Sequence, residues 1–252
     1  MDYRNQKVMI GLSGGINSMA VLCWLAQYKL RPDDIYLFYS HFKEHSPETL
    51  PFVKAGVKYA SKHFKNVIYE QEDNSVLEFF RSKKMIPHPI FAPCTLELKI
   101  EPAIKFSSRH NCTIDLIGYV KTEMGRVRNM TSKGANNLFL SKEFPIIHFS
   151  DDDCFEIVKK EIGWYPKIYD LIDEKGKRVF KHNNCLPCKN MRLKDYQAVK
   201  KYYPEYWKEA QNLATELQKH WGRDKSEYVD LIMVDFGRES WEVETSCKVC
   251  NF

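Results

Sequence analysis

A short Gly-rich segment between an apolar strand-like run and an apolar helix-like run has the residue types that bind an oxyanion. The segment is Ser13-Gly14-Gly15-Ile16-Asn17-Ser18. Ser13, Gly14 and Gly15 can turn sharply and expose backbone N–H groups, Ser18 adds a hydroxyl, and the N-terminus of the following helix adds partial positive charge. No Gly-Lys-Ser/Thr follows and the G-x-G-x-x-G pattern is absent, which excludes a Walker A loop and a dinucleotide fingerprint. The segment therefore predicts a phosphate-binding loop.

Eight cysteines are the second group of chemically informative residues. Two C-x-x-C pairs, Cys185-Leu186-Pro187-Cys188 and Cys247-Lys248-Val249-Cys250, follow a single upstream Cys94. A C-x-x-C turn places two sulfurs close enough for one metal ion or one edge of a cluster. In a cytosolic chain such cysteines favour metal, cluster or thiol chemistry over disulfides. The isolated cysteines have apolar or element-terminal neighbours and are expected to be buried structural thiols, namely Cys23, Cys112 and Cys154.

The composition is that of a soluble globular protein. Of the 252 residues, 44% are hydrophobic and 28% are charged, and the net charge is +5. No apolar run approaches the roughly 20 residues of a membrane span, and the start MDYRNQK lacks the apolar core of a signal peptide. We therefore expect a cytoplasmic protein with no membrane partner. The mild positive charge suits a polyanionic ligand without requiring nucleic acid.

Strand-like runs alternate with helix-like stretches over the first 150 residues. The strands are expected at 8–12, 35–39, 66–69, 113–118 and 144–149, and the helices at 18–28, 48–64, 75–84 and 96–108. This rhythm predicts an α/β fold, a three-layer doubly wound and mostly parallel sheet covered on both faces. Ligands of such sheets bind beyond the carboxyl ends of the strands, where the 13–18 loop falls.

The character of the chain changes near Asp151. We expect a nucleotide-binding α/β domain at 1–150 and a helical, cysteine-containing region at 151–252 packed on it. Ser150 is expected to cap a helix whose first turn holds Asp151, Asp152 and Asp153. Apolar and aromatic residues then repeat at helical spacing from Leu193 to Leu217, interrupted near Pro204, which indicates core packing.

The 13–18 loop resembles the SGGxDS pyrophosphate loop of the PP-loop enzymes, with Asn17 in place of the Asp. Those enzymes bind ATP or a related adenine nucleotide and usually act at its α-phosphate. The resemblance implies an adenine nucleotide with Mg²⁺ at Ser13, Gly14, Gly15, Asn17 and Ser18. Asn17 removes a negative charge from the region of the phosphates and the metal, so ATP hydrolysis is less secure than nucleotide binding.

Four further segments, in the same order, resemble the iron–sulfur sulfonucleotide reductases. Cys94 with Leu98-Lys99-Ile100-Glu101-Pro102 is similar to CC-x-x-RK-x-x-P, and 118–126 is similar to G-x-x-x-x-E-S-x-x-R, with Arg126 one position early. The 145–153 segment is similar to P-L-x-x-W-T-x-x-D, with Phe149 for Trp, and 184–188 falls where the family has G-C-x-x-C. The chain thus resembles the phosphoadenosine phosphosulfate (PAPS) reductase-like branch of the PP-loop superfamily, whose fold is adenine nucleotide alpha hydrolase-like.

This resemblance implies roles for individual residues. Lys99 and Arg126 would contact phosphate or sulfate groups. Cys94, Cys185 and Cys188 would bind an iron–sulfur cluster of the 4Fe-4S type, with Cys250 the expected fourth ligand and Cys247 its substitute, or with one iron left open for an exogenous sulfide. A zinc site built from the two C-x-x-C pairs is the alternative, because the same spacing serves zinc.

Three functions are compatible with these residues. The first is adenylation-coupled sulfur transfer to an acceptor such as tRNA or DNA, with a separate reductant or sulfur donor. The second is reduction of a sulfonucleotide, in which Cys247 or Cys250 would be the attacking thiol. The third is a non-catalytic nucleotide or nucleic-acid binding module with structural zinc. The oligomeric state is left open, a homodimer included.

Overall fold

Five parallel strands form the central sheet of the computed structural model, which describes residues 1–85, 93–132 and 140–221. The strands are β1 (Val8–Gly11), β2 (Asp34–Phe42), β3 (Asn66–Asn74), β4 (Ile114–Leu116) and β5 (Ser141–Glu143), in the order β3-β2-β1-β4-β5. Every neighbouring pair is parallel. The central β1 is apolar and buried because helices cover both faces of the sheet. The predicted parallel sheet is confirmed.

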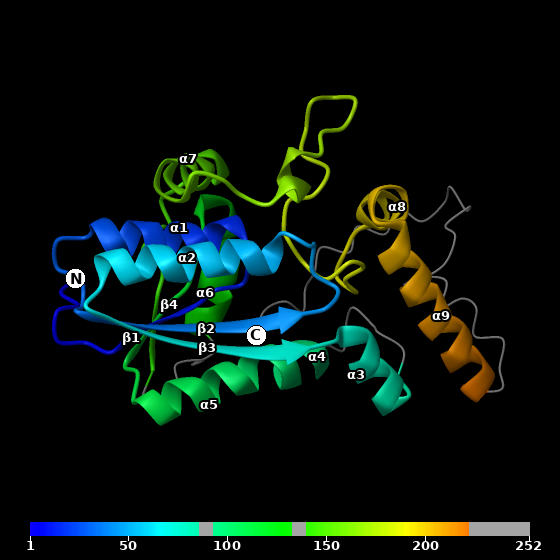
Figure 1. Cartoon of the computed structure of the whole chain (residues 1–252), viewed down its shortest axis with the longest axis horizontal. Helices are drawn as coiled ribbons and strands as arrows, with labels where there is room; N and C mark the ends of the chain where they lie inside the picture. Colours follow the sequence, from blue (N-terminus) through cyan, green and yellow to red (C-terminus); the bar gives the residue numbers. More distant parts are fainter. Residues whose placement is uncertain (86–92, 133–139, 222–252) are drawn as a thin grey trace.

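Helices form the two outer layers (Figure 1). On one side of the sheet lie α1 (Ile16–Gln27), α2 (Thr49–His63) and α7 (Asp151–Ile162), and on the other lies α5 (Glu101–His110). The remaining helical segments are α3 (Val76–Lys83), α4 (Pro93–Thr95), η1 (Leu96–Ile100), η2 (Lys121–Glu123), α6 (Met124–Ser132), η3 (Lys167–Asp170), α8 (Leu193–Tyr202) and α9 (Pro204–Trp221). This is the three-layer arrangement of the adenine nucleotide alpha hydrolase-like fold.

The fifth strand lies elsewhere than the sequence predicts. Residues 144–149 form successive turns, in which Ile147 N–H donates to the Phe144 carbonyl at 3.2 Å and Phe149 N–H to the Ile146 carbonyl at 2.9 Å. Ile146 is fully buried, so its apolar character reflects core packing and not a strand. Pro145 has no N–H for a sheet ladder. The polar Ser141–Glu143 pairs with β4 instead, as a short edge strand.

The region after residue 150 adds helices to the same core. Ser150 Oγ accepts the Asp153 N–H at 3.1 Å, and Asp153 Oδ2 accepts the Ser150 N–H at 2.7 Å, so the predicted cap of α7 is confirmed. The apolar face of α7 packs against α1. Pro204 separates α8 from α9, as expected. The division at residue 150 stays a prediction. No helix in the described ranges is long and apolar enough to cross a membrane.

The predicted apolar stripe packs into two different clusters. Tyr196, Val199 and Trp207 join the main core with β1, β2 and α1. The later apolar residues of α9 pack in a second cluster with Phe42, Phe80 and Cys185. These α9 residues are Ala210, Leu213, Ala214 and Leu217. Helix α9 therefore covers the edge of the molecule where the cysteines lie.

Candidate nucleotide and cysteine site

The predicted phosphate loop connects β1 to α1 at the carboxyl edge of the sheet. Gly15 is the N-cap residue of α1, and no side chain caps the helix there. The loop N–H groups bond to hydroxyls at long distances: Gly15 to Ser13 Oγ at 3.3 Å and Ile16 to Tyr169 Oη at 3.3 Å. Ser18 Oγ lies 3.1 Å from both Ser13 N and Ser13 Oγ. The result is a turn of backbone N–H and hydroxyl groups at a helix N-terminus, which suits an oxyanion.

Gly14 and Gly118 are the two positions where a side chain would collide with the walls of the loop. Gly14 has a φ of +74°, and a Cβ there would lie 2.2 Å from Thr49 Cγ2. A Cβ on Gly118 would lie 2.7 Å from the backbone oxygen of Asn17. The end of β4 and the start of α2 thus approach the loop so closely that only glycine fits.

Asn183 joins the phosphate loop to the segment that carries the C-x-x-C pair. Its Nδ2 donates to the Gly14 carbonyl at 3.0 Å and to Thr49 Oγ1 at 2.7 Å, and its Oδ1 accepts from Ser46 Oγ at 3.2 Å. The side chain is buried, and it forms one small hydrogen-bond network with these partners. Tyr169 Oη adds a second link, because it accepts both the Ile16 N–H and the Asn183 N–H. Sequence reasoning missed both residues, although Asn183 lies two positions before Cys185.

The structure brings Cys94 together with Cys185 and Cys188, which lie far from it in the sequence. Cys185 is buried in the cluster formed with α3 and α9, and Cys94 and Cys188 pack against that cluster. The C-x-x-C segment is fixed by its backbone: Leu186 N–H donates to the Glu44 carbonyl at 2.8 Å, and the Cys188 carbonyl accepts from Tyr196 Oη at 2.8 Å. The predicted partners Cys250 and Cys247 lie outside the described residues.

The pKa values of Cys185 and Cys94 are both shifted by burial and by neighbouring groups. Burial raises the pKa of Cys185, and the neighbouring Cys188, Glu44 and Cys94 raise it further, whereas Lys99 lowers it. Burial also raises the pKa of Cys94, with a contribution from Cys188, and Lys189 and Lys99 oppose it. Thiolates in this apolar site therefore need positive charge close by, which the two lysines or a bound cation supply.

The three thiols give this site sulfur donors. In the described ranges, no group of three or more His, Cys, Asp or Glu side chains is arranged to hold one metal ion. A 4Fe-4S cluster binds each thiolate to a different iron, so its ligands need not converge on one point, and sulfur-only donors in an apolar surrounding suit it. Cys94, Cys185 and Cys188 are the residues that would hold it.

The other predicted residues lie at the two ends of the site. Lys99 is exposed at the cysteine end, with its Nζ 5.0 Å from the centre of the Phe42 ring. Arg126 lies at the loop end, 4.4 Å from the centre of the Tyr119 ring, and pairs with Glu123. Their contact with phosphate or sulfate stays a prediction. The three isolated cysteines are buried, as predicted. They are Cys23, Cys112 and Cys154.

Comparisons with known proteins agree with this architecture. No family model matches the chain. An uncharacterized protein of Methanocaldococcus jannaschii is 25% identical over 219 residues, which cover 84% of this chain and 42% of that protein. The chain thus spans less than half the length of this curated relative.

Among solved structures, the U34-tRNA thiolase NcsA of Methanococcus maripaludis, described with its [4Fe-4S] cluster, has a TM-score of 0.50 at 15% identity, over 99% of this chain and 81% of its own. The chain has the fold of the PP-loop enzymes. The PAPS reductase of Candida auris matches with a TM-score of 0.43 at 14% identity, over 65% of this chain and 77% of its own. The NMN synthetase of Francisella tularensis matches with a TM-score of 0.46 at 14% identity, over 90% of this chain and 82% of its own.

Asn17, where the 13–18 loop departs from the SGGxDS pattern that it resembles, has a hydrogen-bond partner. Asn17 Nδ2 donates to Glu123 Oε2 at 3.4 Å, and the same oxygen accepts the Val120 N–H at 3.3 Å. The other carboxylate oxygen, Oε1, pairs with Arg126 at 2.5 Å. An Asp at position 17 would place a second carboxylate beside Glu123, whereas the amide of Asn17 is a donor. Glu123 thus supplies a carboxylate at the edge of the 13–18 loop.

We predict that Asn17→Asp destabilises the nucleotide-free protein by about 1 kcal/mol or more, because it replaces a hydrogen bond with charge repulsion. The free energy of urea unfolding measures this effect. In a double-mutant cycle, Glu123→Gln should remove most of the penalty. If Asn17→Asp destabilises the wild type and the Glu123→Gln variant equally, the repulsion between the two carboxylates is contradicted. If the missing charge at position 17 limits metal-assisted catalysis, Asn17→Asp should raise ATP turnover, and assaying the same variants with Mg-ATP measures this effect.

Proposed function

We propose that this protein is a PP-loop enzyme of the PAPS reductase-like family that couples an adenine nucleotide to sulfur transfer onto a nucleic acid. The observation that carries the proposal is the attachment of the C-x-x-C segment to the PP-loop through Asn183, with Cys94 packed beside it. One site thus contains a phosphate-binding loop and three thiols, which are the two parts that adenylation-coupled sulfur transfer needs.

The residues of the chain have distinct tasks in this reaction. The N–H and hydroxyl groups of Ser13 to Ser18 hold the phosphates of ATP, with Mg²⁺. An acceptor oxygen attacks the α-phosphorus, a P–O bond forms, and pyrophosphate leaves with the electrons of the bond that breaks. Sulfide from a donor then forms the C–S bond and AMP leaves with the acceptor oxygen. A cluster on Cys94, Cys185 and Cys188 would supply an iron that holds sulfide.

Similarity to a known thiolase supports this choice among the three functions. The U34-tRNA thiolase carries a [4Fe-4S] cluster and shares the fold over 99% of this chain. Arg126 and Glu123 at the PP-loop give the chain charged groups beside the nucleotide. We therefore assign the expected cofactors as ATP with Mg²⁺ and a 4Fe-4S cluster, and the expected acceptor as tRNA or DNA.

Metal analysis and calorimetry of protein purified without oxygen test the proposal. We expect iron and acid-labile sulfide, a brown colour from thiolate–iron charge transfer, and binding of ATP. Binding of a sulfonucleotide in preference to ATP would favour a reductase that attacks sulfate with a thiol. One zinc and no iron would overturn the cluster and favour a binding module with structural zinc.

A further inference from the structure

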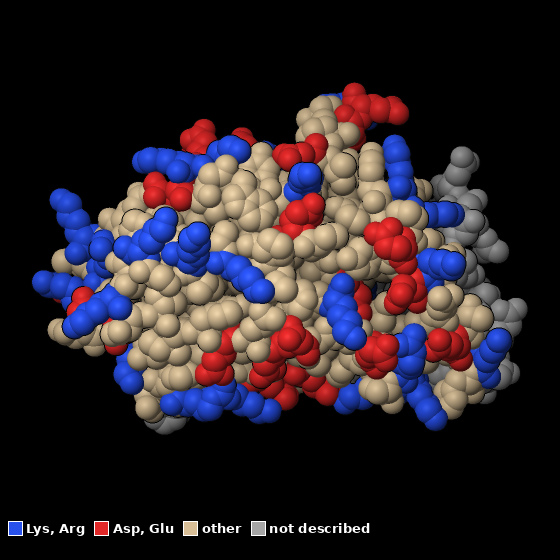
Figure 2. Space-filling model, in the orientation of Figure 1, with Lys and Arg blue, Asp and Glu red and all other residues tan. Residues whose placement is uncertain are grey.

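Three exposed lysines follow one another along the outer face of α2. Lys54, Lys58 and Lys62 are spaced four residues apart, so each step advances about 6 Å along the helix. Within the described residues none of the three forms an ion pair. Figure 2 shows blue side chains in a row over α2. We call Lys54, Lys58 and Lys62 the α2 lysine row. An unpaired row of this kind attracts a polyanion.

The end of α7 adds positive charge to the same layer. Tyr59 of α2 donates its hydroxyl to Glu161 of α7 at 2.9 Å, which holds the two helices together. Lys159 and Lys160 are exposed on α7 just before this contact. Glu161, the carboxylate between the two helices, is already bonded to Tyr59 and lies 3.9 Å from Lys160. The positive charge of the row therefore extends to the end of α7.

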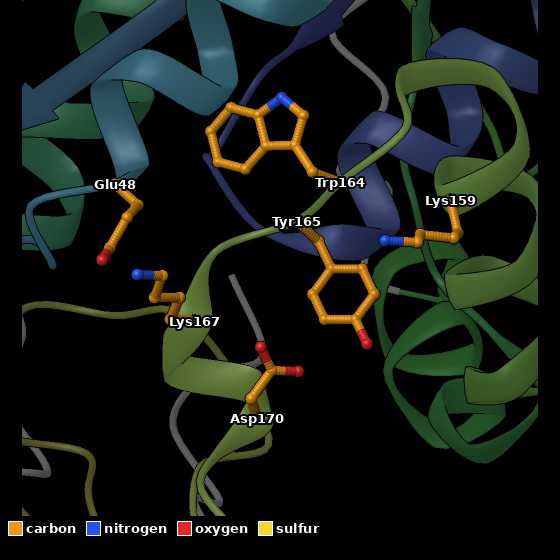
Figure 3. A pocket seen from close by; sticks show the side chains of 6 residues that line it. All are labelled: Glu48, Lys159, Trp164, Tyr165, Lys167 and Asp170. Atoms are coloured by element: carbon orange, nitrogen blue, oxygen red, sulfur yellow. The ribbon is translucent and has the colours of Figure 1, made fainter.

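An open pocket of about 340 Å³ lies where α7 ends and η3 begins (Figure 3). Its lining combines two aromatic rings, two cations and two carboxylates, from Trp164, Tyr165, Lys159, Lys167, Glu48 and Asp170. Trp164 packs edge-on against Phe52, with ring centres 5.4 Å apart. Lys159 Nζ lies 5.8 Å from the centre of the Tyr165 ring. The rings are thus held in place while the pocket stays open to solvent.

This combination of groups fits one unpaired nucleotide. Aromatic side chains stack on any exposed base, and lysines pair with its phosphate. Carboxylates such as Glu48 and Asp170 can accept hydrogen bonds from the amino group of a base. A base inside a duplex presents no free face to such a pocket, so a single-stranded loop or end is the better ligand.

The pocket is connected to the PP-loop through η3. Asp170 lines the pocket, and the adjacent Tyr169 points its hydroxyl at the Ile16 N–H of the PP-loop. Glu48, on the opposite wall, is the N-cap residue of α2, whose first residue Thr49 contacts Gly14. A nucleotide in the pocket would therefore lie beside the adenylation site.

We propose that the pocket at Trp164 and Tyr165 binds an unpaired nucleotide of the acceptor RNA, and that the α2 lysine row binds the phosphates of the flanking strand. This inference rests on the proposed function for the identity of the acceptor as nucleic acid. It adds the surface that would hold the acceptor and specifies its single-stranded character.

Fluorescence anisotropy with labelled single-stranded RNA, unfractionated tRNA and duplex DNA tests the surface. We expect Lys54→Glu/Lys58→Glu/Lys62→Glu to weaken RNA binding at least about tenfold, and to reduce the slope of log affinity against log salt by about 2. The control Lys29→Glu/Lys105→Glu/Lys208→Glu changes the charge equally at exposed positions in the turn after α1, on α5 and on α9. Equal losses in both triple variants would overturn the assignment to α2.

The pocket is tested separately. Trp164→Leu should weaken binding of single-stranded RNA, and Trp164→Phe should retain most of it. Because Trp164 also packs on Phe52, Lys159→Glu/Lys167→Glu provides a second test that leaves that contact in place. Duplex DNA bound as tightly as single-stranded RNA would overturn the unpaired nucleotide. ATP affinity and iron content are measured on the same proteins. A wild-type protein that binds ATP and iron but no RNA contradicts this inference alone. A wild-type protein that binds neither ATP nor iron contradicts the proposed function.

Discussion

Gly14→Ala should destabilise the protein far more than the same substitution at Gly176. Both glycines have nearly the same positive φ, +74° and +70°, but a Cβ at Gly176 meets nothing within 4 Å, whereas one at Gly14 lies 2.2 Å from Thr49 Cγ2. The backbone strain of Ala at positive φ costs about 1 kcal/mol at either site. The collision at Gly14 adds about 2 kcal/mol, because the surrounding core is closely packed. Urea unfolding of the two variants measures the difference.

The collision of the alanine Cβ with Thr49 in the Gly14→Ala variant can be relieved while the hydrogen bond between Asn183 and residue 49 is kept. Thr49→Ser removes Cγ2 and keeps the hydroxyl that accepts from Asn183. We expect Thr49→Ser to restore part of the stability of Gly14→Ala, and the nucleotide affinity to remain low because the loop is displaced. Gly15→Ala, with its nearest neighbour at 3.3 Å, should keep the fold and weaken ATP binding. Equal stabilities of Gly14→Ala and Gly176→Ala would contradict the steric explanation.

Serine at Cys94, Cys185 or Cys188 should remove the iron of the proposed cluster. A serine hydroxyl is a poor ligand for iron–sulfur clusters, and three ligands from two distant segments leave no spare thiol in the described part of the site. We expect the iron content per protein to fall close to zero in each variant. The measurement is elemental analysis of anaerobically purified protein, together with visible absorption.

Cys112→Ser is the matched control for Cys185→Ser. The two thiols are buried to nearly the same extent, 6% and 5% exposed, but Cys112 packs beside Met9 and Phe106 on the other side of the sheet. Iron should stay bound in Cys112→Ser. If zinc is found instead, persists in Cys94→Ser and is lost in Cys247→Ser, the two C-x-x-C pairs form a zinc site and the cluster is excluded.

Local patterns predicted those parts of the molecule that depend on neighbouring residues. The Gly-rich turn at 13–18, the cap at Ser150 and the break at Pro204 are encoded within a few positions of the chain, and each lies where it was expected. The predicted position of the fifth strand was wrong, because burial of Ile146 in the core produces the same apolar signal as a strand.

The links between distant segments could not be predicted in this way. Asn183 bonds to Gly14 and Thr49, which are more than 130 positions away, and nothing in its immediate neighbours specifies those partners. Glu123 was known only as a residue of a motif, and its bond to Asn17 depends on how β4 and α1 come together. Such contacts follow from the tertiary fold, and a single sequence contains no local signal for them.

The Asn183 side chain has a thermodynamic consequence if the protein binds the two ligands of the proposed function. Because one buried amide bonds to Gly14 and Thr49 and is followed two residues later by Cys185, a shift of either segment changes the energy of the other. Occupation of the phosphate loop and occupation of the thiols then share one coupling free energy. Such coupling is reciprocal. If bound nucleotide tightens the binding of the group on the cysteines by some factor, that group tightens the binding of nucleotide by the same factor.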